Sequence, residues 1–151
     1  MNIVFNKKIN HLFLIIIICT LDQISKIYVN TNIFKLLSKD LAIITIEFVR
    51  NYGAAFNLLS GSRLFLSFIS VISTIILSYF IFLSENKLIN KLGLSFILAG
   101  SIGNGVDRIL RGYVIDFIKI KYIDFPVFNI ADLAINVGVL LLIINYFKNK
   151  S

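Results

Sequence analysis

The chain has few of the residue types that build disulfides or transition-metal sites. Its 151 residues include one cysteine, one histidine and one proline, and they include no tryptophan. A single cysteine excludes an internal disulfide. One histidine with one cysteine argues against a His/Cys zinc site and against a Cys–His catalytic pair. Cys19 lies inside an apolar run, and we expect it to be a small packing residue.

Charged residues are also scarce, at 15% of the chain, whereas 58% of the residues are hydrophobic and the mean hydropathy is +0.88. This composition is too apolar for an ordinary soluble domain and predicts one integral membrane domain over residues 1–151. The net charge is +7, and the basic residues lie between the apolar segments. That distribution indicates contact with anionic lipid headgroups and control of topology, with no nucleic-acid partner.

Four apolar segments are long enough to cross a membrane, since a span needs roughly 20 residues. We predict helices at about 9–29, 64–83, 92–110 and 129–147. The start of the chain resembles a secretory signal peptide, because two lysines precede an apolar run. No Ala-x-Ala cleavage site follows, and Asp22 and Lys26 occupy its place, so we expect the first helix to be retained.

The segments at about 30–61 and 113–125 are rich in β-branched residues and predict short strands. The predicted fold is therefore a membrane all-α bundle of four transmembrane helices with a small extracytoplasmic β-rich segment. Short basic flanks indicate the cytoplasmic side by the positive-inside rule. They lie near the N-terminus, between the second and third helices, and at the C-terminus, which places both termini in the cytoplasm.

Two aspartates, Asp116 and Asp132, are the leading candidates for chemistry, because an ionisable group at membrane depth is costly. Extended structure would place Asp116 on one face with Val114 and Ile118. A surface aspartate at the headgroup level is the alternative. Asp132 follows Asn129, which is a good N-cap, so it can also serve as the acid at N3 of a helix. Two carboxylates that approach each other suggest acid–base catalysis, with one protonated and one ionised.

The local settings of the two aspartates predict different roles. A helix N-terminus favours the ionised form of Asp132. An apolar setting favours the protonated form of Asp116. Our hypothesis is that Asp132 is the ionised member and Asp116 carries the proton. Strong coupling would make the protons a property of the pair.

Other polar residues gather at the predicted outer ends of the helices. Asp22 and Lys26 are four apart, acid first, and predict a helical ion pair. Asp107 is placed to pair with Arg111 on the same helix or with Lys26 across helices, and the adjacent Arg108 points elsewhere. A charged network that only fixes the helix ends is the alternative for these residues.

Five blocks carry a resemblance to a known family. They are Asp22-Gln23-Ile24-Ser25-Lys26, Asn51-Tyr52-Gly53-Ala54-Ala55-Phe56, Gly103-Asn104-Gly105-Val106-Asp107-Arg108, Val114-Ile115-Asp116-Phe117 and Phe128-Asn129-Ile130-Ala131-Asp132. Each block alone is weak, but together and in this order the chain resembles signal peptidase II, the lipoprotein signal peptidase family. The resemblance implies Asp116 and Asp132 as the catalytic pair. It implies supporting or substrate-binding roles for Asp22, Lys26, Asn51, Gly53, Asn104, Asp107, Arg108 and Asn129.

The resemblance also implies a function. It predicts an aspartic endopeptidase that removes signal peptides from bacterial prolipoproteins and cleaves the amide before a diacylglyceryl-modified cysteine. It implies no metal and no cofactor. The implied partners are lipidated prolipoproteins and membrane lipids. We expect a monomer in the bacterial cytoplasmic (inner) membrane, with the active site near the outer face.

Two other functions remain open on the residues alone. A small proton-coupled transporter would also contain intramembrane acids, although near the midplane. A non-catalytic membrane scaffold would use all of these polar residues for helix packing. Another type of intramembrane aspartyl protease would need a Gly-x-Gly-Asp motif on a helix, which the sequence lacks.

Overall fold

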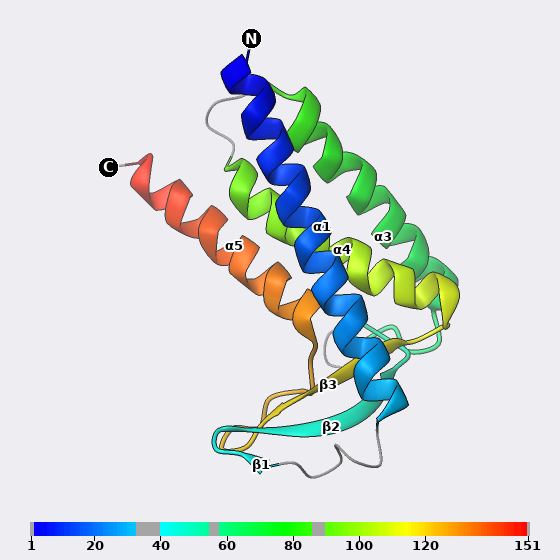
Figure 1. The fold of residues 1–151 in the computed structure, drawn as a ribbon. Helices are drawn as coiled ribbons and strands as arrows, with labels where there is room; N and C mark the ends of the chain where they lie inside the picture. The colour runs from blue at the N-terminus through cyan, green and yellow to red at the C-terminus, as the bar shows by residue number, and fades with distance from the viewer. Residues whose placement is uncertain (1, 33–39, 55–57, 86–89, 151) are drawn as a thin grey trace.

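The computed structural model describes residues 2–32, 40–54, 58–85 and 90–150 (Figure 1). Four long helices and a small sheet make up this part of the chain. The elements in order are α1 (Asn2–Thr31), β1 (Asp40–Leu41), β2 (Ile44–Asn51), α3 (Arg63–Ser78), the π-helical turn η2 (Tyr79–Leu83), α4 (Lys91–Leu110), β3 (Val114–Ile120) and α5 (Ile130–Lys148). Parts of the predicted 30–61 segment, including Ala55 and Phe56, lie outside the described residues.

Helix α4 is the central helix of the bundle and packs against α1, α3 and α5 (Figure 1). Glycines allow the close approach of α5. A Cβ placed on Gly93 would lie 2.9 Å from the carbonyl oxygen of Gly138, and one placed on Gly100 would clash with the carbonyl oxygen of Ala131. Small residues at such contacts are typical of helix packing in membranes.

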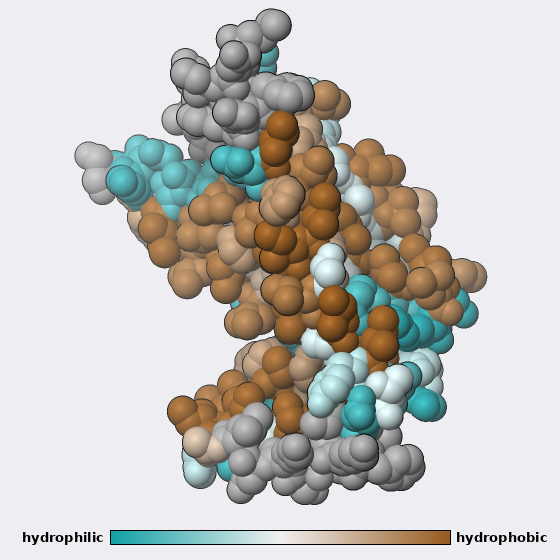
Figure 2. Space-filling model, viewed as in Figure 1, coloured by the Kyte–Doolittle hydropathy of each residue, from teal (hydrophilic) through white to brown (hydrophobic). Residues whose placement is uncertain are grey.

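Three helical segments are long and apolar enough to cross a membrane, namely Lys8–Thr31, Arg63–Leu83 and Ile130–Lys148. Apolar side chains cover the visible face of the helical body (Figure 2). The membrane character of the prediction is therefore confirmed. Helix α4 is present close to the predicted 92–110, but it is not among these three segments. Its polar residues, such as Asn104 and Asp107, are buried inside the bundle.

The sheet lies at the end of the bundle opposite the two termini (Figure 1). It has three antiparallel strands in the order β1-β2-β3. The register of β2 and β3 runs from Ile44 opposite Ile120 to Asn51 opposite Val114, with an irregularity between Ile46 and Val49. The structure therefore contains the predicted small β-rich segment.

A polar layer separates two apolar clusters along α1. Ile15 and Ile18 belong to the cluster within the bundle, and Val29 belongs to the cluster under the sheet. Between them, the side chains of Asp22 and Lys26 are fully buried. Charged groups in such a position must be paired, because an isolated buried charge is very costly. The polar layer is therefore where the candidate site lies.

Candidate active site

Asp116 comes from β3, and the alternation of that strand sets its direction. Ile115 and Phe117 pack into the apolar cluster, whereas Val114 and Asp116 line a cavity on the other face. Val114 and Asp116 therefore share a face as predicted, whereas Ile118, predicted on the same face, packs against the apolar cluster. The alternative of a surface aspartate is wrong, because Asp116 is only 2% exposed.

Backbone bonds between β3 and Phe128 bring Asp132 to the same cavity. The Ile118 amide donates to the Phe128 carbonyl at 2.8 Å, and the Phe128 amide donates back to Ile118 at 3.0 Å. Helix α5 begins two residues later. Its first turn contains Asp132, which is half-buried and lines the cavity with Asp116.

Asn129 contacts both aspartates. Its Oδ1 accepts from the Asp132 amide at 2.9 Å, and the Asp132 Oδ2 accepts from the Asn129 amide at 3.2 Å. This reciprocal capping box confirms Asn129 as the N-cap and Asp132 as the acid at N3. The Asn129 Nδ2 donates to the Asp116 Oδ1 at 2.6 Å. One side chain therefore fixes the start of α5 and orients the carboxylate on β3.

Asn51, at the end of β2, holds the second oxygen of Asp116. Its Nδ2 donates to the Asp116 Oδ2 at 2.9 Å, and its Oδ1 accepts from the Gly53 amide at 2.9 Å. Arg108 reaches the same turn from α4, since its Nη2 donates to the Gly53 carbonyl at 2.9 Å. Asn51 thus uses both its donor and its acceptor, and Arg108 attaches the turn to the bundle.

Asn104 links the second aspartate to the polar layer. Its Nδ2 donates to the Asp132 Oδ1 at 2.7 Å. Its Oδ1 accepts from the Lys26 Nζ at 3.0 Å and from the Asn129 Nδ2 at 3.1 Å. The side chain is 6% exposed, and its orientation is fixed by these three bonds.

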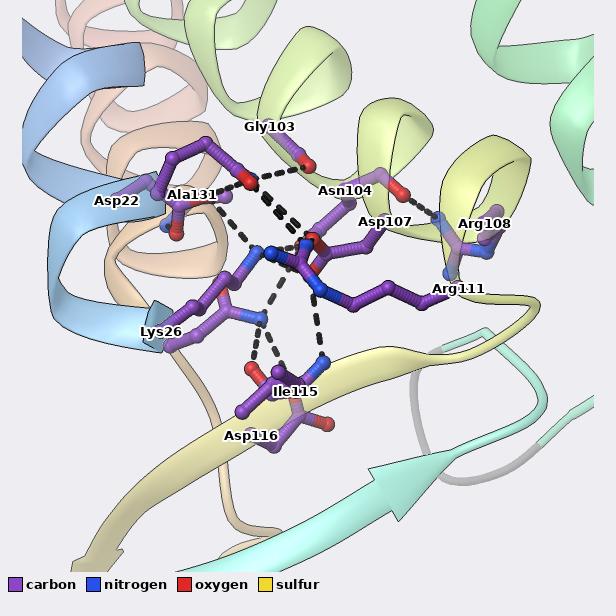
Figure 3. A network of polar contacts seen from close by, with 12 residues as sticks. Asp22, Lys26, Gly103, Asn104, Asp107, Arg108, Arg111, Ile115, Asp116 and Ala131 are labelled. Atoms are coloured by element: carbon purple, nitrogen blue, oxygen red, sulfur yellow. Dashed lines mark hydrogen bonds and ion pairs between the residues drawn. The ribbon is translucent and has the colours of Figure 1, made fainter. Parts of the chain in front are cut away.

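Lys26 forms the centre of a buried charge network (Figure 3). Its Nζ lies 2.8 Å from Asp22 and 2.9 Å from Asp107, and Arg111 forms a second ion pair with Asp107. Two acids and two bases make this network formally neutral. Buried pairs persist only when such bonds offset the cost of desolvation. The predicted pairs of Asp22 with Lys26 and of Asp107 with Lys26 and Arg111 are confirmed.

The network also binds the backbone of the elements around the cavity. The Ala131 amide in α5 donates to Asp22 at 2.9 Å, and the Ile115 amide in β3 donates to Asp107 at 3.3 Å. Gln23 adds a bond to the Gly103 carbonyl at 3.1 Å. The predicted site set omitted Gln23, although its position beside Asp22 could have suggested it.

The cavity has a volume of about 890 Å³ and lies between the helical body and the sheet. A recess between these two parts is visible in Figure 2. The lining of the cavity combines the two aspartates and other polar groups with apolar side chains from β2, β3 and α5. The lining residues are Val49, Arg50, Asn51, Ala54, Ser70, Ser101, Asn104, Arg108, Val114, Asp116, Phe125, Pro126, Val127, Phe128, Asp132, Ile135 and Asn136.

The environment of Asp116 favours its protonated form. Burial raises the pKa of Asp116 to about 6, and the nearby Asp132 charge adds to this effect. Hydrogen bonds from Asn51 and Asn129 act in the opposite direction. Near neutral pH this carboxyl can therefore exchange a proton. Within the described residues, no group of three or more His, Cys, Asp or Glu side chains is placed to hold a metal ion.

All ten predicted site residues lie in or beside the cavity and the adjoining network. Asn104 and Asn129 connect the two aspartates to Lys26, which spacing in the sequence does not reveal. Arg108 points away from Asp107, as predicted from their adjacency. Cys19 is half-buried and donates to the Ala99 carbonyl at 3.3 Å, consistent with a packing role.

Comparisons with known proteins agree in one family. The family model described as signal peptidase (SPase) II matches residues 14–148. The lipoprotein signal peptidase of Gloeothece citriformis is 36% identical over 136 residues, covering 87% of this chain and 84% of that protein. The lipoprotein signal peptidase of Lactiplantibacillus plantarum is 32% identical over 143 residues, covering 93% and 96%.

A solved structure has the same fold. It is a bacterial membrane enzyme solved by the in meso method at 2.3 Å, with a TM-score of 0.83 and 34% identity. The match covers 94% of this chain and 90% of that one. A second bacterial membrane enzyme, solved at 1.9 Å, has a TM-score of 0.78 at the same identity. The chain therefore belongs to the signal peptidase II family of membrane aspartyl peptidases.

Proposed function

We propose that Asp116 and Asp132 are the catalytic pair of a peptidase that removes the signal peptide from diacylglyceryl-modified prolipoproteins. One observation carries the proposal. The two carboxylates line one cavity, and amide groups hold them, whereas the neighbouring cations Lys26 and Arg111 pair with other acids. Among the described residues, neither Asp116 nor Asp132 forms an ion pair. Both remain available for proton transfer.

In the proposed reaction, the ionised Asp132 takes a proton from a water molecule. The water oxygen then attacks the carbonyl carbon before the lipidated cysteine, and protonated Asp116 donates its proton to the carbonyl oxygen. In the second step the C–N bond breaks. Asp132 gives its proton to the leaving nitrogen, and Asp116 takes a proton back from a hydroxyl group of the tetrahedral intermediate, which gives a free cysteine amine and a carboxyl group on the signal peptide. The raised pKa of Asp116 supports its role as the proton donor.

The supporting residues position this pair. Asn51 and Asn129 fix the carboxylate of Asp116, and Asn104 fixes that of Asp132. Arg108 holds the Gly53 carbonyl and so fixes the turn next to Asn51. The remaining supporting residues Asp22, Lys26 and Asp107 act at a distance, through the backbone of α5 and β3.

For the membrane placement, we propose one domain over residues 1–151 with all four long helices as spans, including α4. Twenty residues of α4 give a length of about 30 Å, which matches the hydrocarbon core. Helices α1 and α4 begin and α5 ends toward the end of the bundle where both termini lie (Figure 1), and Lys8, Lys91 and Lys148 belong to those helix ends. That end is therefore proposed as cytoplasmic, and the sheet and cavity as outer, in the bacterial inner membrane.

The proposed substrate fits this placement. Its acyl chains would remain in the bilayer while its scissile amide enters the cavity near the outer surface. The proposed partners are lipidated prolipoproteins and membrane lipids, and we propose a monomer because one chain supplies both aspartates.

The test is cleavage of a purified diacylglyceryl-modified prolipoprotein by the wild type, Asp116→Asn and Asp132→Asn. We expect loss of activity in both variants, with folding and substrate binding retained. Asp124→Asn is the matched control, because Asp124 is fully exposed and its ion pair with Lys119 is long, at 3.9 Å. Full activity in Asp116→Asn or in Asp132→Asn would remove that aspartate from the mechanism.

Two further results would favour another function. Proton-coupled flux in vesicles without any cleavage would support a transporter. Normal cellular function of both Asp116→Asn and Asp132→Asn, with only reduced stability, would support a scaffold. Labelling by a membrane-impermeant maleimide tests the topology in a Cys19→Ser background. Tyr122→Cys should react from outside the cell, and Lys148→Cys should react only after lysis.

A further inference from the structure

The side of the cavity away from the sheet contains two polar side chains that the proposed mechanism does not use. Ser101 in α4 precedes Asn104 by three residues, and Asn136 in α5 follows Asp132 by four. Helix α4 runs toward the sheet and α5 runs away from it (Figure 1). Ser101 is therefore displaced along its helix by about 4.5 Å from Asn104, which bonds to Asp132, and Asn136 by about 6 Å from Asp132, both away from the sheet, at 1.5 Å per residue.

The two helices are in close contact at this level. A Cβ placed on Gly100 would lie 2.6 Å from the Cγ1 of Ile135. Ser101 and Asn136 each follow one of these contact residues in the chain. They therefore lie on the two walls of the cavity where α4 and α5 meet, and both line it.

Neither side chain has a hydrogen bond to any described residue of the protein. Other helical hydroxyl groups do bond to the carbonyl four residues earlier, as Ser70 does to Leu66 at 3.0 Å and Ser95 does to Lys91 at 2.7 Å. Asn136 is exposed on an otherwise apolar stretch of α5. An amide at membrane depth without a partner is costly, so a ligand that supplies one would bind favourably.

We propose that Ser101 and Asn136 donate hydrogen bonds to a carbonyl oxygen of the lipidated substrate, on the membrane side of the scissile amide. This inference rests on the proposed function. At that depth such a substrate offers two kinds of unpaired carbonyl. One kind is the ester carbonyl of the diacylglyceryl group. The other is among the last four backbone carbonyls of the signal-peptide helix, which lack partners within that helix.

This contact would exist before and during the reaction, so its loss should raise KM with little change in kcat. We expect Asn136→Leu to raise KM about three- to tenfold for an ester-linked substrate, as for one lost hydrogen bond. Ser101→Ala should have a smaller effect, and Asn136→Gln should retain part of the affinity. Ser73→Ala in α3 is the matched control, because Ser73 does not line the cavity.

An ether-linked dialkyl substrate distinguishes the two carbonyl sources. If the ester carbonyl is bound, Asn136→Leu and wild type will have equal KM for the ether substrate. If a peptide carbonyl is bound, the increase in KM will persist. Wild-type KM in Asn136→Leu, Ser101→Ala and the double variant, all with the ester substrate, would overturn the inference.

A binding measurement separates this inference from the proposed function. The probe is the same ester-linked lipopeptide, and the readout is its equilibrium affinity for purified protein. Wild type that binds the peptide but never cleaves it would refute the function. If Asn136→Leu still weakened that binding, the inferred hydrogen bonds to the substrate would be supported. If Asn136→Leu bound the lipopeptide as tightly as wild type, the inference would be refuted as well.

Discussion

Asn129 and Asp132 bond to each other twice at the start of α5. The Asn129 Oδ1 accepts from the Asp132 amide, and the Asp132 Oδ2 accepts from the Asn129 amide. The same Asn129 also holds Asp116 through its Nδ2 at 2.6 Å. A helix cap and a catalytic support are therefore combined in one side chain. The capping interpretation of Asp132 and its proposed catalytic role are compatible.

Asn129→Ser separates these two roles. Serine is a good N-cap, so the helix should lose at most about 1 kcal/mol of stability. Its hydroxyl is too short to hold Asp116 as the amide does. A hydrogen bond to a carboxylate contributes about 1.5–3 kcal/mol, so kcat should fall about 10- to 100-fold. Thermal unfolding in detergent and a cleavage assay check the two effects.

The matched variant is Asn129→Ala, which removes both the cap and the bond to Asp116. It should lose as much activity as Asn129→Ser and lose more stability. If Asn129→Ser kept wild-type kcat, the bond from Asn129 to Asp116 would have no role in positioning the carboxylate.

Removing Lys26 should lower the stability of the protein, because the polar layer would lose its central cation. Lys26→Met leaves Asp22 without its cation in a fully buried position. Breaking one partner of a buried pair costs about 3–5 kcal/mol. The double variant Lys26→Met with Asp22→Asn restores a neutral network and should recover part of that loss. Unfolding free energies of the two variants measure the effect.

Lys119→Met is the control for the removal of a lysine. Lys119 is partly exposed and lies 3.9 Å from Asp124, so its loss should cost about 0–1 kcal/mol. A similar cost for Lys26→Met and Lys119→Met would show that the buried network contributes little to stability.

The activity should depend on the protonation of Asp116. Its pKa of about 6, above the ordinary 3.8, means that it is protonated below pH 6 and ionised above. If Asp116 donates the proton, kcat/KM falls about tenfold per pH unit well above pH 6. A pH profile with a substrate that has no titrating group in this range measures the fall.

The same raised pKa changes stability. The folded state holds this proton more tightly than the unfolded state, so its contribution is greatest below pH 3.8 and is lost as the pH rises to about 6. Asp116→Asn cannot ionise. Its stability relative to wild type should therefore increase between pH 4 and 7, and a constant difference would contradict the raised pKa.

The sequence predicted the contacts that depend on short spacing. Asp22 and Lys26 are four positions apart, about one helical turn, and Asn129 and Asp132 are three positions apart, the spacing of a capping box. The alternation of β3 placed Asp116 correctly because strand side chains alternate between faces. These patterns are local, so they can be read without knowing how the helices cross.

Contacts between distant segments could not be predicted in this way. Asn104 joins Lys26 to Asp132, and Gln23 reaches Gly103, only because α1, α4 and α5 meet at one level. The same crossing places Asn136 on the cavity wall. Small residues permit this crossing, but their spacing in the sequence does not specify which helices they join.

Gly100→Ala tests whether that crossing controls the site. The added methyl group would clash with the carbonyl oxygen of Ala131, one residue before Asp132, and the backbone would have to move. Overpacking of this kind costs about 1–3 kcal/mol. Displacement of α5 would also break the bond from Asn104 to Asp132, so we expect lower stability together with a large loss of kcat.

The neighbouring position gives the control for Gly100→Ala. Ser101→Ala changes the next residue of α4 without adding volume at the helix contact, so its unfolding free energy should remain within about 0.5 kcal/mol of wild type. Loss of both stability and kcat in Gly100→Ala, with neither lost in Ser101→Ala, would show that helix packing positions Asp132. Normal kcat in a destabilised Gly100→Ala would instead show that α4 and α5 can separate while the capping box and Asn104 still hold the carboxylate in place.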